Sequence, residues 1–490
     1  MNMKKQLTLF ILLIITYPSY SQKRLNVNEC ISLALQHNQK IEIARRQVKA
    51  ADALRKSAFT QYLPNFSING GYSYFNKDFR LLKEDMLLPV IPYSAIDPAT
   101  GQVSSALLSS PAVAASTFVV NPATGSVVKD AAGNPVFQKY TWLPASKATF
   151  GIDNFYMING GFTQPVYLGG KIRETNRIAR YTRESAEQNL SLSEDEIKYS
   201  TEEAYWRVVS VTEKARLAKK YKEMLVRLVS DLENIRAEGI ITDNDLLKAK
   251  LKLSEADLSL LKAVNGAEMS KMVLCQMTGL SYSEELILSD SLNTYENETE
   301  EIVFDEDAIN ERPEIKILGS GVEIARSGVK IMQSRFLPNI GLTAGYTFMN
   351  PNPYNGLAEE FGSDYNIGVA VNIPVFHFGD RKHTLNAAKY EQESAELKLQ
   401  ETKELLILQL HQAAYRHNES VTKAKLAELS LEQASRNLEY TRDNFNEGRL
   451  KTTDLLEAQL LWQKAYSELI DARTEQQLSA SNLKKVTAKY

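Results

Sequence analysis

Residues Glu238 to Leu251 read EGIITDNDLLKAKL, and residues Glu447 to Leu460 read EGRLKTTDLLEAQL. Seven of these fourteen positions are identical at an offset of 209 residues. Each stretch passes from a glycine, which suits a chain reversal, into an apolar pattern with the period of a helix. A match of this kind indicates that the two halves of the chain are copies of one unit.

Two further matches extend the duplication outward. QPVY at 164–167 aligns with IPVF at 373–376 at the same offset. YLPNFSINGGY at 62–72 aligns with FLPNIGLTAGY at 336–346 at an offset of 274. The offset changes by 65, so we expect the first half to carry about 65 residues that the second half lacks.

The duplication predicts the organisation of the chain. We expect a signal peptide at 1–21, a first repeat at 22–295 and a second repeat at 296–490. The first repeat is predicted to hold strands at about 64–75 and 148–168, an outer loop at 76–149, and long helices at about 171–236 and 243–277. The second is predicted to hold strands at about 338–349 and 364–376, and long helices at about 381–446 and 453–488.

Composition and the first residues restrict the class of protein. Lys4 and Lys5 precede a short apolar run and a small-residue cleavage site, which is the pattern of a secretory signal. Basic residues number 57 against 60 acidic ones, so there is no basic excess for phosphates and we expect no nucleic-acid partner. Cys30 and Cys275 are too few for a disulfide framework, and whether they pair stays open.

The four predicted strands alternate apolar and polar residues. Such alternation fits a membrane strand with one face toward lipid and one toward a wet lumen, although a soluble sandwich has the same period. The polar face is small and neutral and aromatic residues lie near the strand ends, which favours lipid. Four strands cannot close a barrel alone, so several chains must share one. The lumen-facing candidates are Asp153, Asn159, Asn366 and Asn372.

Two stretches, 171–236 and 381–446, each run for 66 residues without Gly or Pro. At 1.5 Å per residue each could reach ~100 Å as a single helix. Apolar residues recur every seven positions along the first stretch, and an Ala lane runs along the helix that follows it, which is typical of closely packed antiparallel helices. This pattern predicts coiled coils and does not by itself indicate their purpose.

No group of residues proposes chemistry. The five histidines are scattered, and His411 and His417 lie six residues apart, which does not place them on one helical face. The sequence also lacks a phosphate-binding fingerprint. We therefore expect no enzyme activity, no cofactor and no metal site.

The duplicated order of strand, strand, long helix and helix, with its LPN, QPVYLGG and EG…DLL…A motifs, resembles the TolC-like outer-membrane efflux protein family. The resemblance implies a mainly α fold with β. Long antiparallel coiled-coil helices would form a periplasmic α-barrel, joined to a four-strand contribution to a shared transmembrane β-barrel. It implies a homotrimer in the outer membrane of a Gram-negative bacterium, in contact with outer-membrane lipid and with its helices in the periplasm.

The resemblance also implies a function. Such a chain would be the passive exit duct of a tripartite efflux or type I secretion system, with a periplasmic adaptor protein and an inner-membrane pump as partners. Drug, metal and protein substrates are not distinguished. The alternative from the residues alone is a secreted or periplasmic structural coiled-coil protein with a soluble β-sheet.

A gate at the periplasmic end is implied by the resemblance as well, formed by an acidic ring and inter-helix bonds where the helices turn. By position Asp454 and Glu457 would supply the ring, and Asp245 would contribute from the first-half turn. Phe445 stands where the family has a gate tyrosine, and Leu450 where it has an arginine, so the ring carries over better than the bonds. The alternative for Asp454 is that it only caps a helix.

Overall fold

The computed structural model of the chain describes residues 23–76, 79–150, 152–239, 241–282, 286–292 and 307–487. The expected signal peptide at 1–21 lies outside these residues. Contacts divide the chain into a helical unit of Met1–Gln61, Leu168–Leu337 and Pro374–Tyr490, and a strand unit of Tyr62–Tyr167 and Pro338–Ile373. Each unit takes segments from both halves of the sequence, so the structural units cut across the two sequence repeats.

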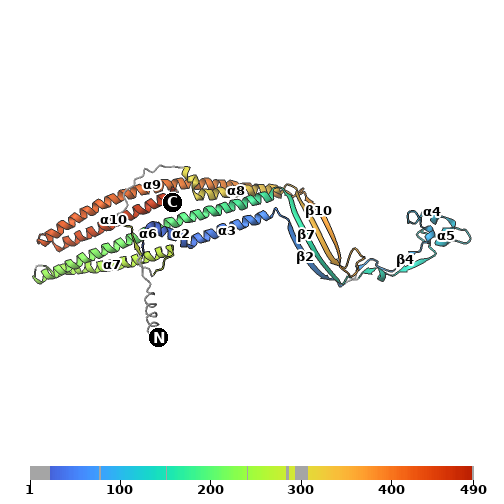
Figure 1. The fold of residues 1–490 in the computed structure, drawn as a ribbon, viewed down its shortest axis with the longest axis horizontal. Helices are drawn as coiled ribbons and strands as arrows, with labels where there is room; N and C mark the ends of the chain where they lie inside the picture. The colour runs from blue at the N-terminus through green and yellow to red at the C-terminus, as the bar shows by residue number, and fades with distance from the viewer. Residues whose placement is uncertain are drawn as a thin grey trace, which may run out of the picture. The chain divides into compact units, whose positions relative to one another are not determined.

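The helices of the helical unit follow the Gly- and Pro-free stretches of the sequence. They are α2 (Val27–His37), α3 (Gln39–Thr60), α6 (Lys171–Ala237), α7 (Asp243–Thr278), α8 (Pro313–Ser334), α9 (Asp380–Asn446) and α10 (Thr452–Val486), labelled in Figure 1. The four long helices lie within two residues of the bounds expected for them. A parallel ribbon of β1 (Lys23–Leu25) and β8 (Leu286–Leu288) and the short helix η3 (Asp307–Glu311) belong to the same unit.

Helix α6 lies in the middle of this unit, where it packs against α3, α7, α8 and α10, while α9 packs against α8 and α10. Its heptad positions face these neighbours, and Leu225 and Leu232 are fully buried. Burying one Leu side chain contributes about 1.5–3 kcal/mol. Ala249 and Ala256 of α7 are buried as well, which lets the two backbones approach closely. The repeated sevens of the sequence are therefore the contacts that hold the helices together.

The strand unit contains one four-stranded sheet in the order β10-β9-β7-β2. β2 pairs antiparallel with β7, and β9 pairs antiparallel with β10, with Tyr72 opposite Tyr156 and Tyr346 opposite Tyr365. The strands are β2 (Asn65–Tyr74), β7 (Asn154–Leu168), β9 (Asn339–Asn350) and β10 (Gly362–Asn372).

Two strands differ from their expected bounds. The strand expected at 148–168 is divided into β6 (Thr149–Phe150), which pairs with β3 (Phe79–Arg80), and β7, which begins only at Asn154. The strand expected at 364–376 begins at Gly362 and ends at Asn372. Pro374 lacks the N–H that a longer ladder would need, which accounts for the early end.

The insertion is more ordered than the loop expected at 76–149. It continues the β2–β7 hairpin through β3–β6 and then β4 (Met86–Pro89) paired with β5 (Tyr140–Leu143). The Trp142 indole donates to Asp85 Oδ2 at 3.1 Å, which ties the two sides together. Its other elements are η1 (Tyr93–Ala95), α4 (Ser105–Leu108), α5 (Pro111–Thr117) and η2 (Ala145–Ala148).

Candidate functional site

The first candidate site is formed by the two turns that end the long helices, between α6 and α7 and between α9 and α10. Gly239 and Gly448 occupy equivalent places in these turns with φ of 75° each, a conformation that costs other residues free energy. Behind them lies an apolar group, here called the tip cluster, made mainly of Leu225, Leu228, Leu232, Leu246 and Leu455. Because Leu455 belongs to α10 and the others to α6 and α7, the tip cluster joins the ends of both hairpins.

Asp454 and Asp245 occupy equivalent positions in the first turns of α10 and α7. Asp454 Oδ2 accepts the Lys451 N–H at 3.0 Å, and Asp245 Oδ2 accepts the Thr242 hydroxyl at 2.7 Å. A carboxylate in the first helical turn is also favoured by the helix dipole. Both aspartates therefore help to begin their helices, and each stays partly exposed.

The other predicted gate residues lie around these caps. Glu457 is exposed one turn farther along α10. Phe445 is half-buried against the tip cluster. It makes apolar contacts at the position where a tyrosine was expected to form an inter-helix hydrogen bond. Leu450 is half-buried in the turn itself. The structure thus brings Asp454, Glu457 and Phe445 to one hairpin end, and it places Asp245 at the neighbouring one.

Ion pairs near the first turn were not anticipated from the sequence. Arg236 of α6 pairs with Asp243 of α7, and Lys250 pairs with Glu233 at 2.7 Å. All four side chains are substantially exposed, so each pair contributes only about 0–1 kcal/mol. Opposite charges on the two sides of the turn at Gly239 were the sequence signal that could have revealed these pairs.

The second candidate site is the polar face of the sheet. Asn69 lies opposite Asn159, and Asn366 lies opposite Gly345. Thr347 Oγ1 donates to Asn159 Oδ1 at 3.2 Å, and a Cβ added to Gly345 would lie 2.5 Å from Asn366 Oδ1. Amide side chains therefore form a row that crosses the strands, with Gly345 leaving room for Asn366.

The remaining lumen candidates lie at the margins of this row. Asn372 pairs with Asn339 at the last position of β10, and Asp153 immediately precedes β7 rather than lying within it. Asp364 was missed, because the alternation was read only from Asn366 onward. It lies opposite Thr347 on the polar face and accepts the Tyr354 hydroxyl at 2.9 Å.

The opposite face of the sheet is apolar, and no described part of the chain covers it. Ile68 is 81% exposed, Ile367 79% and Phe66 73%. Isoleucine and phenylalanine side chains of a soluble sandwich would be packed against a second sheet. Aromatic pairs such as Phe66 with Phe162, whose ring centroids lie 5.1 Å apart, link neighbouring strands on this face.

Other reactive residue types lie in the helical unit. Cys30 and Cys275 are both buried in one apolar cluster with Tyr205 and Trp206. His417 of α9 contacts α10, with its Nδ1 3.1 Å from Ser479 Oγ, and burial lowers the pKa of its imidazole. Within the part of the chain that the structure describes, no three His, Cys, Asp or Glu residues are arranged to hold a metal ion. Over the same residues, no helix is both long and apolar enough to cross a bilayer.

Comparison with known proteins gives three similarities besides a family match. A family model described as outer membrane efflux protein matches residues 306–489. Outer membrane protein TolC of Vibrio cholerae is 24% identical over 295 residues, covering 55% of this chain and 66% of TolC. Alkaline protease secretion protein AprF of Pseudomonas aeruginosa is 24% identical over 166 residues, 34% of each chain. The structure of the Campylobacter jejuni CmeC outer membrane channel aligns with a TM-score of 0.71 at 17% identity, covering 94% of this chain and 85% of that one.

The matches to the two sequence relatives cover only part of each protein. The chain spans just under two thirds of TolC and about a third of AprF, and the likeness to CmeC shows the fold. The family model falls on the second repeat, of which the first repeat is an internal copy. The predicted outer-membrane location, with helices in the periplasm, is confirmed. With its duplicated strands and long helices, the chain has the fold of the outer membrane channels with which it aligns, and its residues 306–489 match the outer membrane efflux protein family model.

Proposed function

We propose that the chain is one third of a passive exit duct, a homotrimer in which three four-stranded sheets close one β-barrel around a wet lumen. The observation that carries this proposal is the two-faced sheet, with an uncovered apolar face and a neutral row of amides on the other side. Lipid would cover the first face, and solvent and solutes would contact the second.

The sheet edges support the assembly of several copies. β2 and β10 are the outer strands of the sheet, and each has one side without a partner strand in the described chain. Backbone groups at an open edge cannot remain unpaired in hydrocarbon, where each costs several kcal/mol. Pairing β10 of one copy with β2 of the next satisfies both edges, and three copies supply enough strands for closure.

The duct is proposed to receive its substrates from other components. Its energy would come from an inner-membrane pump, with a periplasmic adaptor protein joining the two, in a tripartite efflux or type I secretion system. No three His, Cys, Asp or Glu residues of the described chain are arranged to hold a metal ion. We propose a transport role without catalysis. The rival role as a soluble structural coiled coil does not account for the uncovered apolar face.

The hairpin ends are proposed to form the periplasmic gate. Asp454 and Glu457 would concentrate negative charge around the opening, with Asp245 and Phe445 beside them. Asp454 would do so while capping its helix, because only one of its oxygens is engaged by the Lys451 N–H. The row that contains Asn159 and Asn366 would line the lumen, with Asn372 and Asp153 near its ends.

The proposal is tested by fractionating cells and measuring the mass of the extracted protein. We expect the chain to require detergent for release from outer membranes and to migrate as a trimer. A monomer released by salt alone would contradict the proposal and would favour the structural coiled coil.

A further inference from the structure

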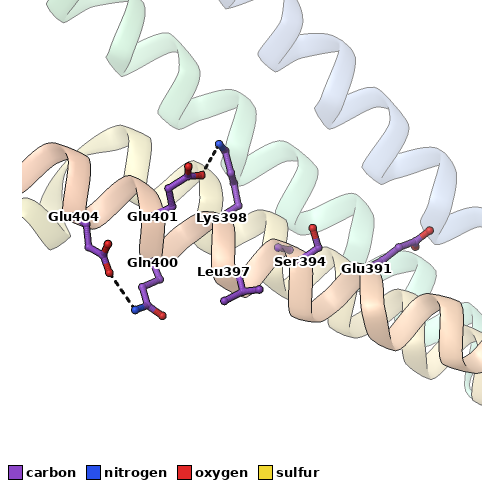
Figure 2. A pocket seen from close by; sticks show the side chains of 8 residues that line it. Glu391, Ser394, Leu397, Lys398, Gln400, Glu401 and Glu404 are labelled. Carbon is purple, nitrogen blue, oxygen red and sulfur yellow. Dashed lines mark hydrogen bonds and ion pairs between the residues drawn. The ribbon is translucent and has the colours of Figure 1, made fainter.

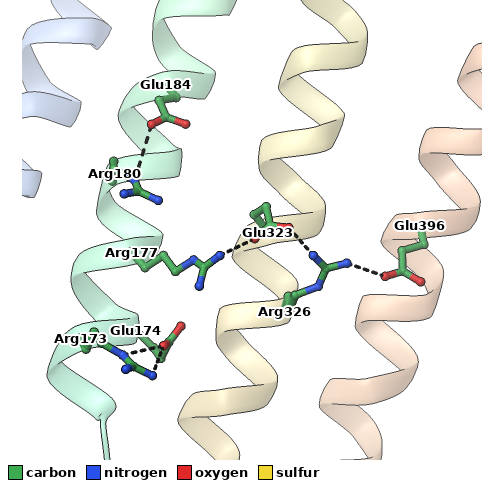
Figure 3. Close-up of polar contacts among 8 residues, drawn as sticks. All are labelled: Arg173, Glu174, Arg177, Arg180, Glu184, Glu323, Arg326 and Glu396. Carbon is green, nitrogen blue, oxygen red and sulfur yellow. Dashed lines mark hydrogen bonds and ion pairs between the residues drawn. The ribbon is translucent and has the colours of Figure 1, made fainter. Parts of the chain in front are cut away.

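Charged side chains on the surface of the helical unit pair with one another. Figure 3 shows a series of ion pairs that runs from Arg177 of α6 through α8 to Glu396 of α9. Figure 2 shows a groove lined by α9 alone, in which Lys398 pairs with Glu401 at 2.8 Å. A groove made by a single helix does not enclose a ligand. Two reactive groups that the proposed duct does not use lie in the interior of this unit instead.

These groups are two cysteine thiols in one apolar cluster. Cys30 of α2 is 0% exposed and Cys275 of α7 is 3% exposed, and both belong to the buried cluster that contains Tyr205 and Trp206 of α6. They are the two cysteines of the whole sequence and lie 245 positions apart in it. Folding therefore brings together the two residues of this chain that can form a disulfide bond.

The antiparallel register of α6 and α7 locates the part of α6 that faces Cys275. Residues 238–242 join the two helices, and Lys222 pairs with Asp257 at 2.8 Å farther along them. Facing residues therefore have numbers that add to about 480, because both helices rise equally per residue. By this rule the residue of α6 that faces Cys275 is Tyr205.

Contacts of α2 bring Cys30 to the same place. Burial raises the pKa of the Tyr205 hydroxyl, and the charge of a Cys30 thiolate would raise it further, because the two side chains are neighbours. At the other end of α2, a Cβ added to Gly279 would lie 2.7 Å from His37 Cβ, so α2 packs along the last turns of α7. Gly279 follows Cys275 by one helical turn, and His37 follows Cys30 by two. Both thiols therefore lie in the cluster around Tyr205, where α2, α6 and α7 meet.

We propose that Cys30 and Cys275 of one copy form a disulfide bond that joins α2 to the end of α7. The helices of this chain lie in the periplasm, which is an oxidising compartment. The oxidant is the disulfide of a periplasmic thiol–disulfide oxidoreductase. Both residues are thiols in this structure, and the bond is a covalent modification that their placement permits.

The exchange takes place in two steps that conserve atoms and charge. The thiolate of one cysteine attacks the disulfide of the oxidant, which forms a mixed disulfide and releases one thiolate of the oxidant. The thiolate of the other cysteine then attacks the sulfur of the chain in this mixed disulfide, so the bond between Cys30 and Cys275 forms and the second oxidant thiolate leaves. Two electrons pass to the oxidant, and the two protons lost by the cysteines end on its dithiol. Because both cysteines are buried after folding, the exchange precedes the closing of the cluster.

The bond would anchor a short helix at the start of the described chain. α2 has 11 residues, and a helix of that length is marginal by itself. Its first N–H, from Val27, donates to Asp290 Oδ2 at 3.0 Å. A covalent link across 245 positions restricts the unfolded chain, so we expect the oxidised chain to resist unfolding better than the reduced one.

Thiol counting in full-length protein recovered from outer membranes tests the bond. Acid quenching protonates thiols and stops exchange, after which the denatured protein is treated with a maleimide that carries polyethylene glycol. We expect no label before reduction and two labels per chain after it, one for each cysteine. Tryptic digestion without reduction should yield residues 25–40 linked to the peptide that contains Cys275. Two labels without reduction, or a disulfide between copies on a denaturing gel, would overturn the proposal.

Single substitutions supply the matched controls. In Cys30→Ala the remaining thiol should take one label before reduction, and Cys275→Ala should behave in the same way. A single variant that takes no label would show that each thiol is blocked independently of the other, which would also overturn the proposal.

Unfolding in urea measures what the bond contributes to stability. Trp206 lies in the cluster and Trp462 packs against it, so their fluorescence reports on its unfolding. A reductant should lower the urea midpoint of the wild type by roughly 0.5 M or more, whereas Cys30→Ala with Cys275→Ala should not respond to it. Equal midpoints for oxidised and reduced wild type would contradict the anchoring role, and the thiol count decides the bond even if the double variant does not fold. Because the bond lies within one copy, these results are separate from those that decide the duct.

Discussion

Substitutions can separate the capping hydrogen bond of Asp454 from its proposed place in the acidic gate. An Asn side chain keeps an oxygen that can accept the Lys451 N–H but carries no charge. We therefore expect Asp454→Asn with Glu457→Gln to preserve stability and to reduce block by divalent cations in a planar bilayer. The half-blocking concentration should rise roughly fivefold or more, because one charge pair at 4 Å is worth ~1 kcal/mol in water. Glu468→Gln is the matched control, since Glu468 is exposed eleven residues from Glu457 on the same helix. Unchanged block in the double variant would refute the acidic gate.

His417 makes stability depend on pH. Burial lowers the pKa of the folded imidazole below the unfolded value of about 6.5, so the unfolded chain binds the proton more readily. Stability should therefore fall as pH drops below that unfolded value. His417→Gln should flatten this part of the profile, whereas the exposed His383→Gln should not. Urea unfolding of detergent-solubilised protein between pH 7.5 and 5 measures both, and equal slopes in all three proteins would contradict the assignment.

At the scale of elements, the two faces of β10 predict opposite responses to the same side chain. Ile367→Lys would place a charge on the proposed lipid face, at a cost of about 2–4 kcal/mol near the bilayer midplane. Asn366→Lys would place it on the amide row, in contact with water. We expect the first variant to lose membrane-inserted protein and the second to insert normally with altered ion selectivity. Equal insertion of both, measured by heat-modifiable migration of outer-membrane extracts, would argue against lipid on that face.

Periodicity explains which elements could be read from the sequence. Strict alternation at Ile340 and Leu342, and sevens through Leu225 and Leu232, reflect contacts that repeat at the period of the element itself. The insertion has no such period. Its strands pair over long separations, as Leu87 does with Trp142 across 55 residues. Local sequence patterns indicate its turns but not which strands they connect. Asp364 was missed for a related reason, since its place on the polar face depends on where β10 begins.

At the scale of the whole molecule, repeats in the sequence became neither domains nor successive halves of the structure. Each sequence repeat contributes strands to one sheet and helices to one bundle. The strands of the two repeats pair their edges with each other, and their long helices bury apolar side chains that a single repeat would leave exposed. Sequence matching revealed the duplication but not this exchange, which depends on long-range contacts such as that between Leu455 of α10 and the α6–α7 tip. The outer strands β2 and β10 would likewise find partners only when several chains assemble.

If copies of this chain form an open path across the outer membrane, single-channel recording in a planar lipid bilayer will detect ions passing through it. Purified oligomer added to one side should give discrete conductance steps of uniform size, reduced by divalent cations from the side that the helices face. Insertion without conductance, or conductance absent from protein shown to be assembled, would mean that the assembled chain is not an open duct.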